Sequence, residues 1–113
     1  MKTNFPVSAN TEIFLHDLKE EMEQSNTNEF VPSTQLLKRF QLQKIRDQYF
    51  IHGFIKTDSS FNGELLKRSG ATVQSTSGNI KTILVNLRSL PDFLKQPGIT
   101  YFEIGNKLHL HKQ

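Results

Sequence analysis

The stretch ELLKRSGATV at residues 64–73 decides the fold, because it returns 28 positions later as DFLKQPGITY at residues 92–101. Each copy opens on an acidic residue and continues to a lysine, the charge order that stabilises a short helix. Each copy then has a glycine, which commonly ends a helix, followed by an apolar run typical of a strand. Ile55 and Ile83 keep the same offset and indicate a strand before each copy. Both halves therefore predict strand–helix–strand.

Two such halves follow one another through a turn at residues 77–79 (Ser-Gly-Asn). Each half is expected to make a right-handed crossover between parallel strands. Together they predict an α+β fold with the ferredoxin-like split βαβ order (βαββαβ), one antiparallel sheet and both helices on one face. The expected strands span residues 49–56, 72–76, 80–87 and 99–104. The expected helices follow Ser60 and Ser89 as N-caps, with Pro91 in the first turn of the second.

Residues 1–40 predict an N-terminal helical extension. A helix is expected over residues 11–24, capped by Asn10 or Thr11, and a short helix is expected from Ser33 or Thr34 through Phe40. Residues 42–56 predict a hairpin whose first strand is short and whose turn lies at 46–48. The chain is thus divided into an extension at 1–40, a ferredoxin-like domain at 41–108 and a tail at 109–113.

Strand alternation predicts which side chains face the helices. The core set is Ile83, Val85 and Leu87 and, through the repeat, Ile51 and Ile55. The face without helices then carries Phe50, His52, Phe54 and Leu84. Part of this face is available to the N-terminal helix. If that helix lies elsewhere, three large apolar side chains form a patch that suggests a partner surface.

The net charge of +3 is unevenly distributed. Residues 1–30 hold six acidic and two basic residues, a net −4, whereas residues 31–113 hold twelve basic and five acidic residues, a net +7. A basic body suits a nucleic acid or an acidic protein surface, and equally an ordinary solvated surface. Phe50 and Phe54 would suit base stacking, but the strand at 80–85 has no aromatic residue. The sequence therefore does not favour a nucleic-acid partner.

Catalytic and metal-binding patterns are not recognisable. The chain has no cysteine, and its four histidines show no ligand spacing; His109 and His111 form a pair without a third ligand. No Ser-His-Asp order or phosphate-binding glycine loop stands out. Apolar runs reach only three residues, too few for a membrane span, and residues 1–10 lack the apolar stretch of a signal peptide. We therefore expect a protein that is not an enzyme and has no cofactor, metal or membrane partner.

The run IKTILVNL at residues 80–87, the pair Leu90-Pro91, and PGITYFE at residues 97–103 resemble the propeptide domain of subtilisin-like serine proteases (subtilases). NTEIFL at residues 10–15 and YFIHGFIK at residues 49–56 are similar to the N-terminal region of subtilases from Bacteroidetes-type bacteria. The resemblance covers roughly residues 10–110. The Asp-Ser/Thr-Gly, His-Gly-Thr and Gly-Thr-Ser-Met-Ala elements of the catalytic domain do not occur, so the chain would be a separate prodomain or a freestanding relative.

The resemblance implies an intramolecular chaperone and product-like inhibitor, secreted or periplasmic, whose partner is a subtilisin-like catalytic domain. It implies that the open sheet face packs on two protease helices and that Glu103 meets their N-termini. It also implies that the tail lies in the active-site cleft with Leu110 four residues before the scissile bond. The expected protease-binding residues are Phe50, Phe54, Leu84, Tyr101, Glu103, Leu110, His111, Lys112 and Gln113. A ferredoxin-like interaction or oligomerisation module is the alternative, and an RNA-binding domain a weaker one.

Overall fold

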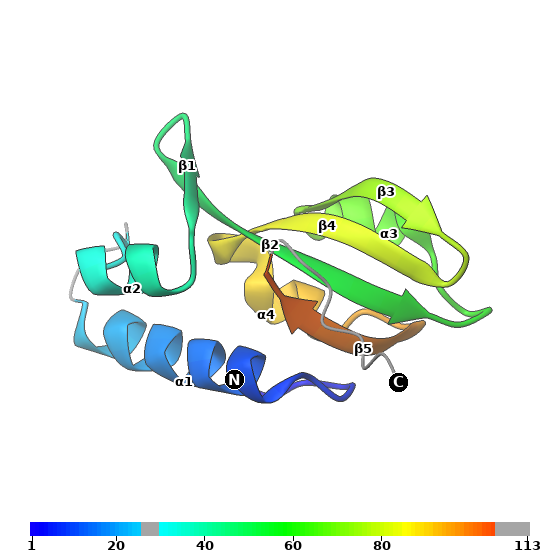
Figure 1. Cartoon of the computed structure of the whole chain (residues 1–113), viewed down its shortest axis with the longest axis horizontal. Coiled ribbons are helices and arrows are strands. Elements are labelled where there is room, and N and C mark those ends of the chain that lie inside the picture. The colour runs from blue at the N-terminus through cyan, green and yellow to red at the C-terminus, as the bar shows by residue number, and fades with distance from the viewer. Residues whose placement is uncertain (26–29, 106–113) are drawn as a thin grey trace, which may run out of the picture.

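The computed structural model describes residues 1–25 and 30–105. Figure 1 shows a sheet with helices behind it and a long helix beside it. In chain order the elements are α1 (Ala9–Gln24), α2 (Thr34–Arg39), β1 (Gln43–Ile45), β2 (Gln48–Thr57), α3 (Gly63–Arg68), β3 (Ala71–Ser77), β4 (Ile80–Asn86), the 3-10 turn η1 (Leu87–Ser89), α4 (Leu90–Phe93) and β5 (Ile99–Ile104).

The sheet has the topology that the repeat predicts. Its order is β5-β2-β4-β3 with every neighbouring pair antiparallel, and the short β1 pairs with the start of β2 on the same edge as β5. β2 and β3 are therefore parallel with β4 between them, and β4 and β5 are parallel with β2 between them. This is the ferredoxin-like split βαβ pattern. The α+β prediction is confirmed, with an antiparallel sheet of five strands and an N-terminal helix.

The start of α1 differs from the predicted one. Ser8, and not Asn10 or Thr11, is the N-cap, and its side chain accepts a hydrogen bond from the Thr11 backbone N–H at 3.2 Å. The Thr11 hydroxyl instead accepts a hydrogen bond from the Ile104 backbone N–H at 2.9 Å. A bond to a residue far along the chain thus decides which of the neighbouring polar residues caps the helix.

Ser33 caps α2, as one of the two predicted candidates, and its side chain accepts a hydrogen bond from the Leu36 backbone N–H at 3.1 Å. The predicted caps of α3 and α4 differ from the observed ones. Asn62 caps α3 and accepts from two backbone N–H groups, whereas Ser60 donates its hydroxyl hydrogen bond to Asp58 at 2.7 Å. Ser89 forms no side-chain cap because η1 already brings it into helical geometry. The predicted strand at 80–87 ends one residue early for the same reason: Leu87 begins η1, although its side chain is buried as expected.

One hydrophobic core lies between the sheet and the helices. Ile51, Ile55, Ile83 and Val85 are buried on the helix side of the sheet, as strand alternation predicts. The same cluster contains side chains from the first 40 residues, namely Phe5, Phe14, Leu15, Leu18, Leu36 and Phe40. The N-terminal extension is therefore a component of the core of the ferredoxin-like unit.

Phe102 of β5 lies at the centre of this core. Its ring packs edge-on against Phe93, with ring centroids 4.9 Å apart, and Phe93 meets Phe5 at 6.1 Å. Gly53 of β2 makes room for it. A Cβ atom at this position would lie 2.6 Å from the Phe102 Cε1 atom and 2.9 Å from the Glu103 carbonyl oxygen. The glycine in the middle of β2 is therefore required by close approach, not by a turn.

The N-terminal segment covers the outer edge of β5. The Ser8 N–H donates to the Phe102 carbonyl and the Phe102 N–H donates to the Pro6 carbonyl, both at 3.1 Å, and Val7 bridges Phe102 in parallel. α1 contacts β5 near its own start, through Thr11, and extends below α2 without crossing the sheet (Figure 1). The face of the sheet opposite α3 and α4, here called the open face, is consequently not covered by α1.

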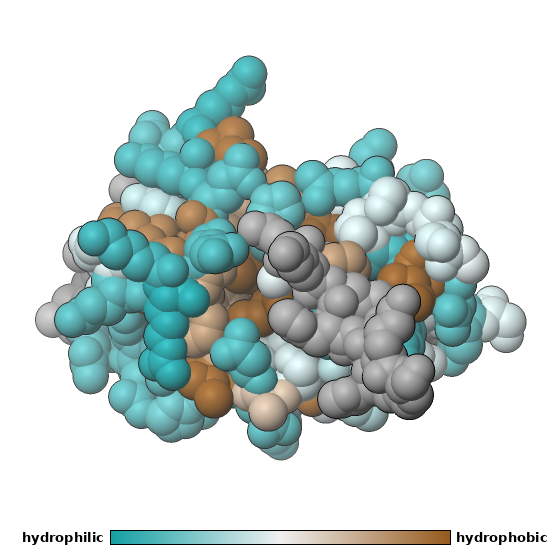
Figure 2. Space-filling view, in the orientation of Figure 1, coloured by the Kyte–Doolittle hydropathy of each residue, from teal (hydrophilic) through white to brown (hydrophobic). Residues whose placement is uncertain are grey.

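Figure 2 shows the molecule from the same side, with hydrophobic residues visible among hydrophilic ones around α1 and α2 and at the margins of the sheet. None of the helices in the described ranges combines the length and apolar character that a membrane span requires.

Candidate functional site

The open face brings together the five sheet residues that the sequence analysis selects. In the register of β2 and β5, Phe54 lies opposite Glu103. Two residue pairs further along, Lys56 of β2 lies opposite Tyr101 of β5. Leu84 of β4 is paired with His52, two residues from both Phe50 and Phe54. Because β-strand side chains alternate between faces, all of these side chains project from the same side of the sheet. Phe50, Phe54, Leu84 and Tyr101 are half-buried.

Glu103 is more buried than its neighbours, with a relative exposure of 5%. The Tyr101 hydroxyl donates a hydrogen bond to its Oε1 atom at 3.0 Å. Burial, followed by this hydrogen bond and the charge of Glu103, raises the pKa of Tyr101, and a hydrogen bond with Ser8 acts in the opposite direction. The carboxylate and the phenol therefore form a pair in which the neutral phenol is the favoured form.

Two further polar residues of the open face were missed by the sequence analysis. The Lys56 Nζ atom lies 5.3 Å from the centre of the Tyr101 ring, a cation–π distance. The Gln43 Oε1 atom lies 2.8 Å from the Nε2 atom of His52 and links β1 to the face. Lys56 could have been predicted, because the strand alternation that places Phe54 on the open face also places Lys56 there. Gln43 becomes visible only when the β1–β2 register, which pairs it with Phe50, is known.

Leu110, His111, Lys112 and Gln113 lie outside the described residues. The product-like role assigned to them by the resemblance therefore stays a prediction.

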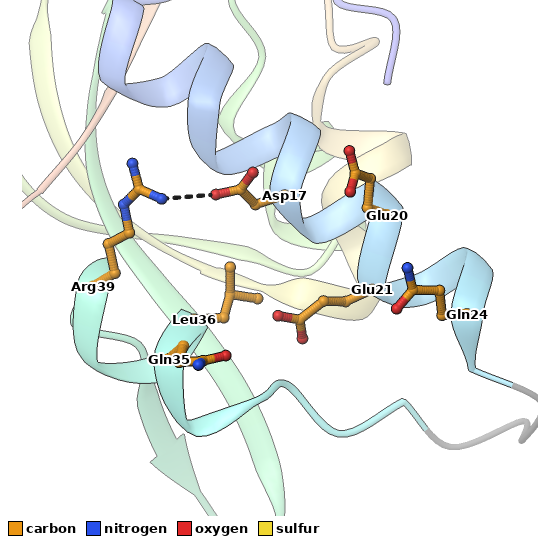
Figure 3. Close-up of a pocket in the computed structure, with 7 residues that line it drawn as sticks. All are labelled: Asp17, Glu20, Glu21, Gln24, Gln35, Leu36 and Arg39. Atoms are coloured by element: carbon orange, nitrogen blue, oxygen red, sulfur yellow. Dashed lines mark hydrogen bonds and ion pairs between the residues drawn. The ribbon is translucent and has the colours of Figure 1, made fainter.

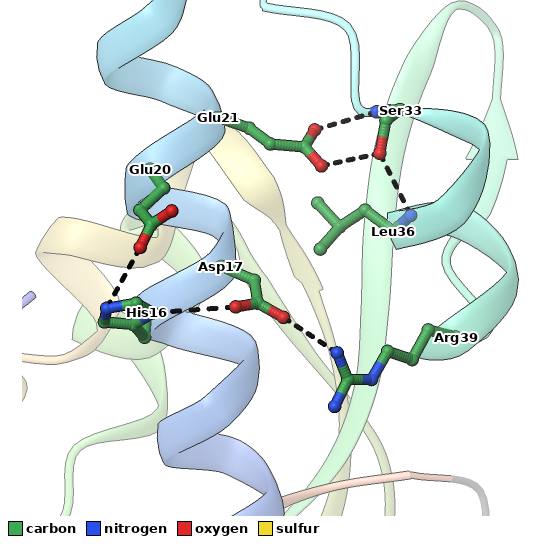
Figure 4. Close-up of polar contacts among 7 residues, drawn as sticks. All are labelled: His16, Asp17, Glu20, Glu21, Ser33, Leu36 and Arg39. Carbon is green, nitrogen blue, oxygen red and sulfur yellow. Dashed lines mark hydrogen bonds and ion pairs between the residues drawn. The ribbon is translucent and has the colours of Figure 1, made fainter.

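A second polar region lies between α1 and α2, where a groove of about 330 Å³ is lined mainly by acidic and amide side chains (Figure 3). Most of its charged groups already hold the two helices together (Figure 4). Glu21 accepts from the Ser33 N–H at 2.9 Å and from the Ser33 hydroxyl at 2.5 Å. Asp17 pairs with Arg39 at 3.1 Å. These contacts dock α2 on α1.

Within residues 1–25 and 30–105, His, Asp and Glu side chains do not gather into a group of three that would suit a metal ion. Comparisons with protein-family models, with curated proteins and with solved structures found no match.

Proposed function

We propose that the chain is a prodomain-type inhibitor and folding assistant of a subtilisin-like serine protease, and that it docks through the open face. The observation that carries the proposal is the grouping of Phe50, Phe54 and Leu84 on the helix-free side of a ferredoxin-like sheet. An apolar group of this kind suits a partner that buries it. The resemblance supplies the partner, a protease that presents two surface helices to the sheet.

Glu103 gives the face an acidic group suited to helix N-termini. A carboxylate there accepts hydrogen bonds from unpaired backbone N–H groups and meets the positive end of the helix dipole. In the free chain the carboxylate is buried and bonded by Tyr101, so docking at Glu103 requires rearrangement of the chain around it. We therefore expect the apolar group to contact the protease first and Glu103 to contact it in a later step.

The test is an inhibition assay with purified subtilisin-like proteases, in which residual activity is measured against the concentration of the full chain. Leu84→Asp places an unpaired charge in the proposed interface, and we expect inhibition to weaken by more than tenfold. Leu65→Asp is the matched control, because Leu65 lies on α3, on the other side of the sheet, and is 39% exposed. Equal weakening by both variants, or no inhibition of any protease by the unmodified chain, would refute docking through the open face.

Glu103→Gln keeps an acceptor for the Tyr101 hydroxyl and removes the charge. Because charge-assisted hydrogen bonds are about twice as strong as neutral ones, the variant should weaken inhibition by about 1 kcal/mol or more, roughly fivefold. Deletion of residues 110–113 should leave the domain folded and weaken inhibition by about tenfold, roughly 1.4 kcal/mol, if the tail enters the active-site cleft. If one of these variants inhibits as well as the unmodified chain, the residues changed in it do not contact the protease. Docking through the open face is then tested by the Leu84→Asp variant alone.

A further inference from the structure

A cleft of about 400 Å³ lies on the other side of the sheet from the open face, at the base of the β1–β2 hairpin. Tyr49 lines it, and strand alternation places this side chain on the same side as the buried Ile51 and opposite Phe50. The rest of the lining comes from the segment before α2 (Phe30 and Val31), from β1 (Lys44), from the β1–β2 turn and the start of β2 (Asp47 and Gln48) and from η1 (Arg88). The cleft is therefore separate from the surface on which the proposed protease docking depends.

The walls of this cleft offer apolar contact area. Phe30 and Tyr49 line it and are partly buried against the core. Val31 is 64% exposed, more than any other large hydrophobic side chain in the described ranges. A narrow inner part of the cleft reaches Met22 and Leu87. An apolar side chain of a partner would replace water on Val31 and contact the two rings.

Two cations lie on opposite sides of Tyr49. Lys44 is its direct partner in β1, along one edge of β2. Arg88 follows two residues after Asn86, which pairs with Phe50 along the other edge of β2. Lys44 and Arg88 thus come from the chain segments on the two sides of β2. The aromatic floor of the cleft is thus flanked by positive charge on both sides.

Asp47 is the one acidic residue among the described residues that line the cleft, and it lies next to Lys44. The Lys44 Nζ atom is 3.9 Å from Asp47, a loose contact between exposed side chains, and 5.9 Å from the centre of the Tyr49 ring. The exposed Arg88 guanidinium forms neither an ion pair nor a hydrogen bond within the part of the chain that the structure describes. An incoming carboxylate at Arg88 therefore does not have to displace an existing partner.

We propose that this cleft binds an extended segment of a partner protein in which one apolar side chain is flanked by acidic side chains. The apolar side chain enters between Phe30, Val31 and Tyr49. The flanking carboxylates pair with Lys44 on one side and Arg88 on the other, and Arg88 has the planar donor geometry for bidentate pairing. A groove with an aromatic ring between two cations suits an extended peptide, whose apolar and acidic side chains are spaced along the chain.

The experiment is an NMR titration of the isotope-labelled full chain with three short peptides, each acetylated and amidated. Acetyl-Glu-Phe-Glu-amide has both features, acetyl-Gln-Phe-Gln-amide lacks the charges, and acetyl-Glu-Gly-Glu-amide lacks the apolar side chain. We expect saturable shifts at the amides of Lys44, Tyr49 and Arg88 with the first peptide, and at least threefold weaker binding of each of the others. Raising the salt concentration should weaken the first peptide most.

Arg88→Gln and Lys44→Gln should each weaken binding of the first peptide by about threefold. Arg68→Gln is the matched control, because Arg68 is exposed on α3 and the substitution changes the net charge equally. An equal effect of Arg68→Gln and Arg88→Gln, equal binding of the charged and uncharged peptides, or no saturable shift would overturn the proposal. Leu84→Asp should leave peptide binding unchanged, so the outcome here is independent of the protease assay.

Discussion

The hydroxyl of Thr11 connects the N-terminal helix to the last strand, and its removal has a predictable cost. Thr11 has no exposed surface, and its Oγ1 atom accepts the hydrogen bond from Ile104 N–H and lies 2.6 Å from the Ser8 hydroxyl. Thr11→Val keeps the shape of the side chain and leaves the buried Ile104 N–H without its acceptor. An unsatisfied buried donor costs about 1–3 kcal/mol, so the free energy of unfolding should fall by that amount.

Urea denaturation followed by circular dichroism measures this change. With an m-value of about 2 kcal/mol/M, the unfolding midpoint should fall by about 0.5–1.5 M at unchanged m. Thr100→Val on the same β5 strand is the matched control, because Thr100 is exposed and the expected change is within about 0.5 kcal/mol. A Thr11→Val protein with the stability of the Thr100→Val protein would show that α1 is not anchored through this bond.

Two further predictions concern the repeat and the Tyr101–Glu103 pair. Leu66 and Leu94 occupy equivalent positions of the repeat and are 1% and 0% exposed, so replacement of either by Ala should lower the free energy of unfolding by about 2–5 kcal/mol. The half-exposed Leu65 should tolerate Ala, and a cost below about 0.5 kcal/mol at Leu94 would contradict the equivalence of the two halves. Because the pKa of Tyr101 is raised in the folded chain, its contribution to stability is complete below the unfolded pKa of about 10 and is lost as the pH rises through the higher folded value. The difference in stability between the unmodified chain and Tyr101→Phe should therefore decrease above pH 10, and a constant difference between pH 8 and pH 11 would argue against the raised pKa.

The sheet was predictable from sequence because its signals are local. The 28-residue repeat, the glycines after each helix and the alternation in residues 80–87 each depend on neighbours within one element. The cap of α1 was wrong because a distant group, the Ile104 N–H, bonds to Thr11. The caps of α3 and α4 were wrong for local reasons, since Ser60 bonds to Asp58 and Ser89 follows the 3-10 turn η1. The preference of small polar residues for the N-cap position predicts that a helix begins near Ser8. The tertiary hydrogen bond between Thr11 and Ile104 determines which hydroxyl caps it.

The candidate site was predictable from the sequence to a similar extent. Alternation alone places Phe50, Phe54 and Leu84 on one face, but it contains no information on how deeply Glu103 is buried. The burial of the Glu103 side chain depends on which residues pack around β5, and no local sequence pattern contains that information. The peptide cleft was not predictable, because Lys44, Tyr49 and Arg88 come from three elements that meet only in the assembled sheet.

The contact between α1 and β5 also has a consequence for synthesis of the protein on the ribosome. Thr11 and Ile104 are 93 positions apart, so α1 is made long before its docking strand exists. At about 5–20 residues per second, the apolar side of α1 waits roughly 5–20 s for β5 to be made. During this interval Phe14, Leu15 and Leu18, all buried in the finished protein, have no β5 to pack against. The nascent chain is therefore expected to be a substrate for chaperones that bind apolar helices, until β5 emerges and the N-terminal helix docks beside it.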